Sequence, residues 1–180
     1  MKRQYVWFAL ISAMLLGAMG VCEADVLQAA PQDVALLPDD GSGVTRIVFL
    51  FDLSKLRTGD NRRIEEALLD WRVNGLSSDE LSEFSAYKVQ TTWTSTAVKS
   101  GTAPTFEGQS TADWQVKSTV PETADGKLVR LDLTKLVDRW ASGVEPNYGT
   151  IVATSALPSK LLASQIGKAQ LTIRYGFRRF

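Results

Sequence analysis

Three aromatic residues and three cations of this sequence border polar segments, where their side chains could act on a ligand. The aromatic residues are Tyr87, Trp93 and Trp114, and an exposed ring of this kind can stack on the apolar face of a sugar much as it stacks on a base. Cations could pair with uronate carboxylates through charge-assisted hydrogen bonds. Burial of the rings in the core and simple solvation of the charges are the competing interpretations. The three cations are Arg72, Lys88 and Lys99.

Several kinds of catalytic chemistry are excluded because the sequence contains no histidine. A Ser-His-Asp triad, a Cys-His pair and a histidine-ligated zinc or copper site all require one. A glycosidase or lyase with paired carboxylates is the weakest remaining hypothesis, since glycoside hydrolysis needs a defined carboxylate separation and no two acids can be placed at a cleft from sequence. We therefore expect a protein that is not an enzyme.

The segment Asp39-Asp40-Gly41-Ser42-Gly43 offers the only group of oxygens that suggests a cation. Asp39, Asp40 and Ser42 could donate oxygens to Ca²⁺. Their spacing is far from that of an EF-hand loop, and a plain turn is the favoured interpretation. No cofactor is expected.

The first 24 residues have the features of a signal peptide. Lys2 and Arg3 supply a positive start, and the apolar run Tyr5–Met19 is shorter than the roughly 20 residues that a membrane-spanning helix needs. Cys22 and Ala24 form a small-x-small cleavage site before Asp25. We predict an exported protein, either secreted or located in the periplasm or at the cell surface, with no membrane span after cleavage.

Two alternatives remain open for the N-terminal segment. It could stay uncleaved as an anchor, or Cys22 could be lipidated. Val21 precedes this cysteine, whereas lipidation sites usually have a small Gly, Ala or Ser at that position.

Cleavage after Ala24 would shorten the chain from 180 to 156 residues and remove its single cysteine. A domain of this size can bury enough apolar surface to fold without disulfides. Without Lys2, Arg3 and Glu23, the 20 basic and 20 acidic residues become 18 and 19. Such a balanced charge provides no long-range attraction, so neither a nucleic acid nor a membrane surface is an expected partner.

The mature sequence reads as one domain of short strands. The range 25–44 is interpreted as a leader with a possible edge strand near Val34–Leu37, residues 45–177 as a single β-sandwich domain, and residues 178–180 as a basic tail. A continuous apolar run suggests a strand buried on both faces, and alternating apolar residues suggest others. These predicted strands are Thr45–Leu53, Ile64–Val73, Phe84–Trp93 and Ala169–Phe177.

One short helix is expected at about Thr134–Trp140. Apolar residues at its i, i+3, i+4 and i+7 positions share one face. Asp132 or Thr134 can cap its first turn, and Gly143 can end it in a left-handed conformation. Trp71 and Trp140 lie on periodic apolar faces and are interpreted as core residues. Asn147 and Gly149 are expected to shape the following turn.

Successive motifs resemble a known family. They are Phe49-Leu50-Phe51-Asp52-Leu53, then Asp132-Leu133-Thr134 with Val137, Trp140, Gly143 and Asn147-Tyr148-Gly149, and finally Leu171-Thr172-Ile173-Arg174-Tyr175. Over about residues 46–175 the sequence is similar to the DNRLRE-type carbohydrate-binding modules. The family usually has a run that contains an acidic residue and a second tryptophan, whereas the run from Trp93 to Ser100 here has neither.

This resemblance implies an all-β fold, an antiparallel jelly-roll-like β-sandwich with one short helix. It also implies a noncatalytic module of exported microbial proteins, which binds a polysaccharide of the cell envelope or the extracellular space. The alternative is a structural domain of the envelope or matrix that docks another exported protein and has no carbohydrate ligand.

Overall fold

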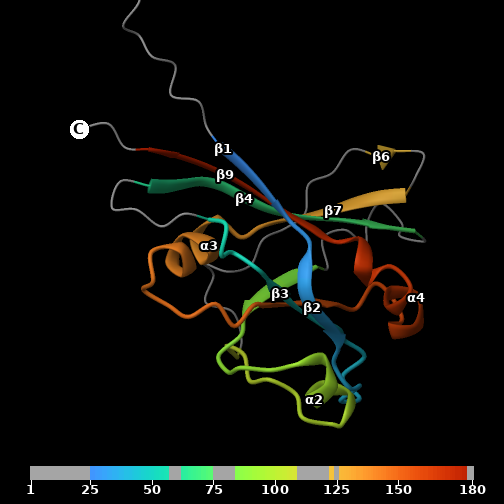
Figure 1. Ribbon diagram of the computed structural model, residues 1–180. Helices are drawn as coiled ribbons and strands as arrows, with labels where there is room; N and C mark the ends of the chain where they lie inside the picture. Colours follow the sequence, from blue (N-terminus) through green and yellow to red (C-terminus); the bar gives the residue numbers. More distant parts are fainter. Residues whose placement is uncertain (1–24, 57–61, 75–83, 109–121, 124–125, 178–180) are drawn as a thin grey trace, which may run out of the picture.

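Two antiparallel sheets pack face to face in the computed structural model, which describes residues 25–56, 62–74, 84–108, 122–123 and 126–177 (Figure 1). The five-stranded sheet has the order β1-β9-β4-β7-β6. Its strands are β1 (Asp25–Ala29), β4 (Arg62–Val73), β6 (Glu122–Thr123), β7 (Gly126–Asp132) and β9 (Gln170–Phe177). The four-stranded sheet has the order β2-β3-β8-β5. Its strands are β2 (Pro31–Leu36), β3 (Thr45–Phe51), β5 (Ser85–Lys88) and β8 (Thr150–Thr154).

The order of the strands confirms the predicted jelly-roll-like sandwich. The chain moves from one sheet to the other at most connections, so that sequence neighbours are often separated and β3 pairs with β8 while β4 lies between β9 and β7. The range 25–44 proves to be more than a leader. Its two strands pair with β9 and β3, so the sandwich begins at Asp25 and not at Thr45.

The predicted helix is present as α3 (Thr134–Ala141), and two five-residue helices, α2 (Ser95–Lys99) and α4 (Ser159–Ala163), were not predicted. A short 3-10 helix, η2 (Ile166–Lys168), precedes β9. Figure 1 shows α3 and α4 at opposite ends of the sandwich and α2 beyond the four-stranded sheet. Helices of five residues complete little more than one turn, which is too short for an apolar period to be visible in the sequence.

The main core fills the space between the sheets. Alternate residues of β3 point into it, and so do alternate residues of β4, because side chains of a strand alternate between its faces. Trp71 lies at its centre with 1% of its surface exposed. Its ring makes edge contacts with Phe49 and Phe84 at centroid distances of 6.0 and 6.1 Å. The tryptophan therefore joins strands of both sheets.

A second apolar cluster covers the other face of the four-stranded sheet. Val48 of β3 and Ile151 of β8 point away from the main core and are fully buried. Residues 89–108 fold back over them and contribute Val89, Trp93 and Val98. The continuous apolar run of β3 is explained by this arrangement, because both of its faces are buried as predicted.

Thr134 was expected to cap helix α3, but its side chain instead joins the helix to strand β4. Its Oγ1 accepts a hydrogen bond from the backbone N–H of Ala67 at 2.9 Å, while the carbonyl of Ala67 accepts from the N–H of Leu133 at 2.7 Å. Asp132 accepts from the backbone N–H of Thr134 at 2.8 Å and from its hydroxyl. These hydrogen bonds fix the connection between β7 and α3. They also satisfy the backbone N–H and carbonyl of Ala67 in the buried part of β4.

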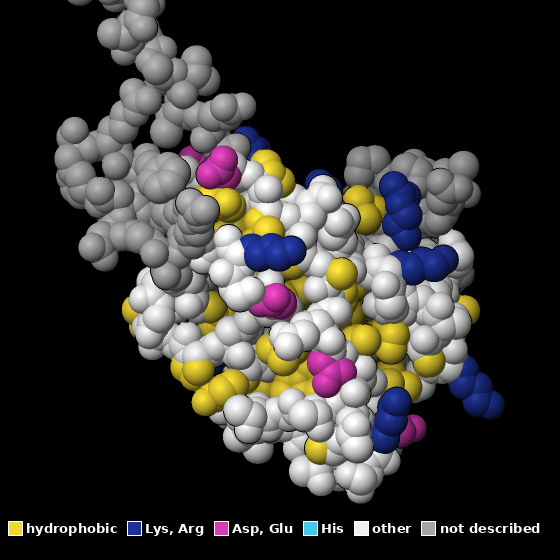
Figure 2. Space-filling model, viewed as in Figure 1, with side chains coloured by type: hydrophobic (Ala, Val, Ile, Leu, Met, Phe, Trp, Pro, Cys, Tyr) yellow, Lys and Arg dark blue, Asp and Glu magenta, His cyan; other side chains and the backbone are white. Residues whose placement is uncertain are grey.

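The outward face of the five-stranded sheet is polar, with opposite charges at facing positions. Arg130 lies opposite Asp70 and contacts it through two nitrogens at 2.7 and 2.8 Å, and Arg174 lies 3.8 Å from Glu66 on the neighbouring strand. On the molecular face in Figure 2, basic and acidic side chains are dispersed among one another. On this face, the described residues therefore produce no large field of one sign.

Candidate functional site

A groove of about 210 Å³ lies where the end of β5 meets the corner between α3 and β8. Two segments that are far apart in the sequence form its walls. They contribute Lys88, Val89, Gln90, Glu145, Pro146 and Tyr148. Drug-sized ligands occupy pockets of roughly 300–1,000 Å³, so this groove suits a smaller group.

Asn147 and Gly149 hold the corner in place. The side-chain amide of Asn147 donates to the carbonyl of Phe51 at 2.9 Å, and its side-chain oxygen accepts from the N–H of Gly149 at 3.1 Å. Gly149 has a φ of +92°, and its carbonyl accepts from the N–H of Val89 at 3.2 Å. The bond of Asn147 thus fixes the corner to β3, and the bond between Val89 and Gly149 joins the two walls of the groove.

Two charged residues of the groove, Lys88 and Glu145, belong to a network of alternating charges that also includes Glu107 and Arg139. The ammonium group of Lys88 lies 2.5 Å from Oε1 of Glu107 and 3.3 Å from Oε1 of Glu145, and the guanidinium of Arg139 bonds to the same oxygen of Glu145. The hydrogen bond to Glu107 is the main reason that the pKa of Lys88 is raised, with a further contribution from Glu145. Lys88 is thus a charged group whose charge is already balanced.

The other polar groups of the groove are largely uncommitted. Within the described ranges, neither the side-chain amide of Gln90 nor the hydroxyl of Tyr148 has a hydrogen-bond partner. Oε2 of Glu145 is buried and also lacks a donor there. A buried acceptor without a partner costs free energy of about 1–3 kcal/mol. The groove therefore offers a neutral amide and a hydroxyl to a ligand, while Oε2 of Glu145 is not accessible from it.

Trp93 does not provide the stacking platform that its sequence context suggested. Only 9% of its surface is exposed, and its indole N–H donates to the carbonyl of Tyr148 at 2.8 Å. The reason is that residues 89–108 fold over the sheet and carry the ring into the second cluster. Tyr87 is half-buried and packs edge-on against Phe106 at 5.8 Å. Neither ring lines the groove.

The remaining predicted binding residues lie in different places. Lys88 is in the groove, whereas Arg72 is exposed on β4 of the other sheet and Lys99 is exposed at the end of α2. Trp114 lies outside the described residues. Sequence reasoning missed Gln90, Glu145, Pro146 and Tyr148. The available signal was the Asn-Tyr-Gly corner. It was assigned to the scaffold as a whole, although its central residue, Tyr148, lines the groove.

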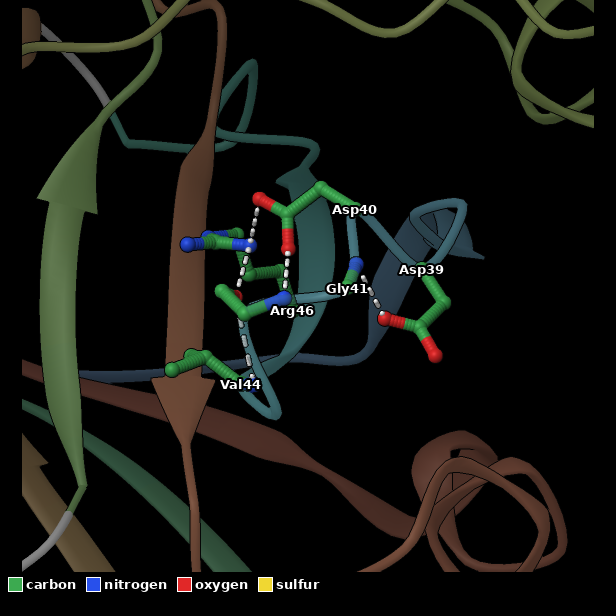
Figure 3. A network of polar contacts seen from close by, with 6 residues as sticks. Asp39, Asp40, Gly41, Val44 and Arg46 are labelled. Atoms are coloured by element: carbon green, nitrogen blue, oxygen red, sulfur yellow. Dashed lines mark hydrogen bonds and ion pairs between the residues drawn. The ribbon is translucent and has the colours of Figure 1, made fainter.

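The oxygens of the Asp39–Ser42 segment serve a turn (Figure 3). Asp39 accepts from the N–H of Gly41 at 2.9 Å, and Asp40 accepts from the N–H of Ser42 at 3.0 Å. Hydrogen bonds from Ser42, with the nearby Arg46, lower the pKa of Asp40. Arg46 donates to Asp40 at 2.7 Å and so places a cation within the cluster. In the ranges that the structure describes, no three acidic side chains converge as a metal site would require.

Comparison with known proteins finds no family model and no curated protein that match this chain. The similarity to DNRLRE-type modules therefore remains a prediction from its motifs. None of the helices in the described part of the chain is long and apolar enough to cross a membrane.

Proposed function

We propose that this chain is an exported, noncatalytic β-sandwich module that binds a polysaccharide of the cell envelope or the extracellular space. The observation that carries the proposal is the groove at the end of β5, where Gln90 and Tyr148 leave hydrogen-bonding groups unused beside the apolar surface of Pro146. Few, well-placed polar groups on an apolar wall are typical of small-ligand sites. The signal-peptide features of the N-terminus support export.

The arrangement of the acids favours binding over hydrolysis. Glu107 and Glu145 are the two carboxylates at the groove, and both contact the ammonium group of Lys88. A glycosidase needs the glycosidic oxygen and often a water molecule between its two carboxyl groups. Here that space is occupied by Lys88, so this pair of acids is unsuited to cleave a glycosidic bond.

Replacement of Gln90 by alanine is expected to weaken polysaccharide binding about fivefold to tenfold, because one hydrogen bond contributes roughly 1 kcal/mol. Affinity electrophoresis through gels that contain different polysaccharides would measure the change. Gln32→Ala is the matched control: this exposed glutamine lies on β2, at the opposite edge of the same sheet. Retention by no polysaccharide would contradict the proposal, and so would equal retention of Gln90→Ala and the parent.

Docking of another exported protein is the second candidate function, and strand β1 is the feature that favours it. β1 pairs with β9 along one edge, and its other edge has no strand partner among the described residues. Val26 on this strand is 56% exposed. Open strand edges can accept a strand from a partner. Purification of the native protein from its source should then recover a complex, and recovery of the monomer alone would count against this function.

A further inference from the structure

We infer that the groove recognises an uncharged, hydroxyl-rich sugar unit and discriminates against uronates. This inference rests on the proposed function and names the class of ligand for the same site. It revises the expectation that Lys88 would pair with a uronate carboxylate.

The charges around Lys88 argue against an anionic ligand. Its ammonium group already has two carboxylate partners, Glu107 and Glu145. A uronate carboxylate that approached Lys88 would come close to both of these acids and would be repelled by them. Arg139 is also engaged, since it bonds to Glu145. With two cations and two anions in contact, the groove has no unbalanced positive charge to compensate a bound carboxylate.

The uncommitted groups fit hydroxyls. A sugar hydroxyl is both a donor and an acceptor, so it can accept from the amide N–H of Gln90 and donate to the side-chain oxygen of Gln90 or the hydroxyl oxygen of Tyr148. The ring of Tyr148 and the side chain of Pro146 supply apolar surface for the C–H face of the same sugar. The indole N–H of Trp93 holds the backbone of Tyr148 in place, because it donates to the carbonyl of that residue.

The size of the groove limits how much of a polysaccharide it holds. Its volume of about 210 Å³ corresponds to the space of roughly seven water molecules. One sugar unit of a longer chain is a suitable occupant, with the neighbouring units outside. Recognition of a single uncharged unit predicts weak binding that depends on hydrogen bonds and little on ionic strength.

The test compares binding to neutral polysaccharides (dextran, mannan and galactan) with binding to the polyuronates alginate and polygalacturonate. We expect the parent protein to be retained by at least one neutral polysaccharide and not by the polyuronates. Retention should be unchanged between about 0.05 and 0.5 M NaCl, because the ligand carries no charge to be screened. Tyr148→Phe should weaken it about fivefold to tenfold. Glu145→Gln should raise retention by alginate, because one negative charge beside Lys88 has been removed.

The outcomes separate this inference from the proposed function. Retention by a polyuronate but by no neutral polysaccharide would overturn the inference and leave the proposed function standing. Equal retention by both classes would do the same, since the groove would then not discriminate. Retention by none of the five would overturn the proposed function, and the inference with it. Neutral-polysaccharide binding that survives both Tyr148→Phe and Gln90→Ala unchanged would show that the groove is not the site, and would overturn the inference.

Discussion

Replacement of Trp71 by alanine is expected to lower the free energy of unfolding by about 3–5 kcal/mol, the usual cost of deleting a large aromatic side chain from a core. The ring is 1% exposed and contacts Phe49 of the opposite sheet and Phe84 just before β5. Removal of the ring would leave a cavity between the two sheets. Neither sheet can fill this space unless the packing of the whole core rearranges. Urea denaturation would measure the loss, and a midpoint equal to that of the parent would contradict this role.

Phenylalanine substitutions at two tryptophans separate the contribution of the indole N–H from that of the ring. The N–H of Trp71 donates to the carbonyl of Gln165 at 3.1 Å, whereas the buried N–H of Trp140 has no acceptor among the described residues. Trp71→Phe removes this bond, but the carbonyl of Gln165 still accepts from the N–H of Lys168 at 3.1 Å, so the lost bond should cost about 0.5–1.5 kcal/mol. Trp140→Phe is the control because it breaks no hydrogen bond, and it should cost less. Equal losses would show that the bond to Gln165 adds nothing.

The strands were predictable because burial leaves a period in the sequence. β4 is the instructive example, since Glu65, Glu66 and Leu68 favour a helix by intrinsic propensity. The alternation of Ala67, Leu69, Trp71 and Val73 pointed to a strand, and these four residues are buried on the inward face. Propensity is a weak preference, and packing of the apolar face overrides it.

The groove could not be predicted because its walls come from segments more than 50 residues apart. Lys88 is the last residue of strand β5, and Glu145 lies in a loop after α3. No local pattern brings them within 3.3 Å of each other. Trp93 shows the same limit, since its burial depends on residues 89–108 folding back over the sheet. Local periodicity carries no information about such tertiary contacts.

The corner Asn147-Tyr148-Gly149 links the scaffold to the candidate site. Its outer residues build the fold, since Asn147 bonds to β3 and Gly149 approaches that strand closely. The residue between them lines the groove. A motif that looks purely structural in the sequence therefore positions Tyr148. Damage to the corner should affect stability and the groove together, which distinguishes it from surface changes at Gln90.

Gly149→Ala is expected to destabilise the protein by about 3–5 kcal/mol, from the strain of a left-handed conformation together with overpacking. The φ of Gly149 is +92°, and a Cβ at this position would lie 2.1 Å from the carbonyl oxygen of Phe49. The obstacle is the backbone of β3, which is held in register by β8 on one side and β2 on the other. It cannot move away as a flexible side chain would, so either the corner or the pairing of β3 with β8 must give way.

Gly143→Ala is the matched control for this substitution. Gly143 also has a positive φ, +72°, but a Cβ there meets no atom within 4 Å. Alanine at 143 should therefore cost only the conformational term, about 1–2 kcal/mol, at the exposed end of α3. The difference between the two variants in urea denaturation isolates the contact with Phe49. If both lost the same free energy, the close approach of the corner to β3 would be wrong, and with it the argument that this contact holds Tyr148 in the groove.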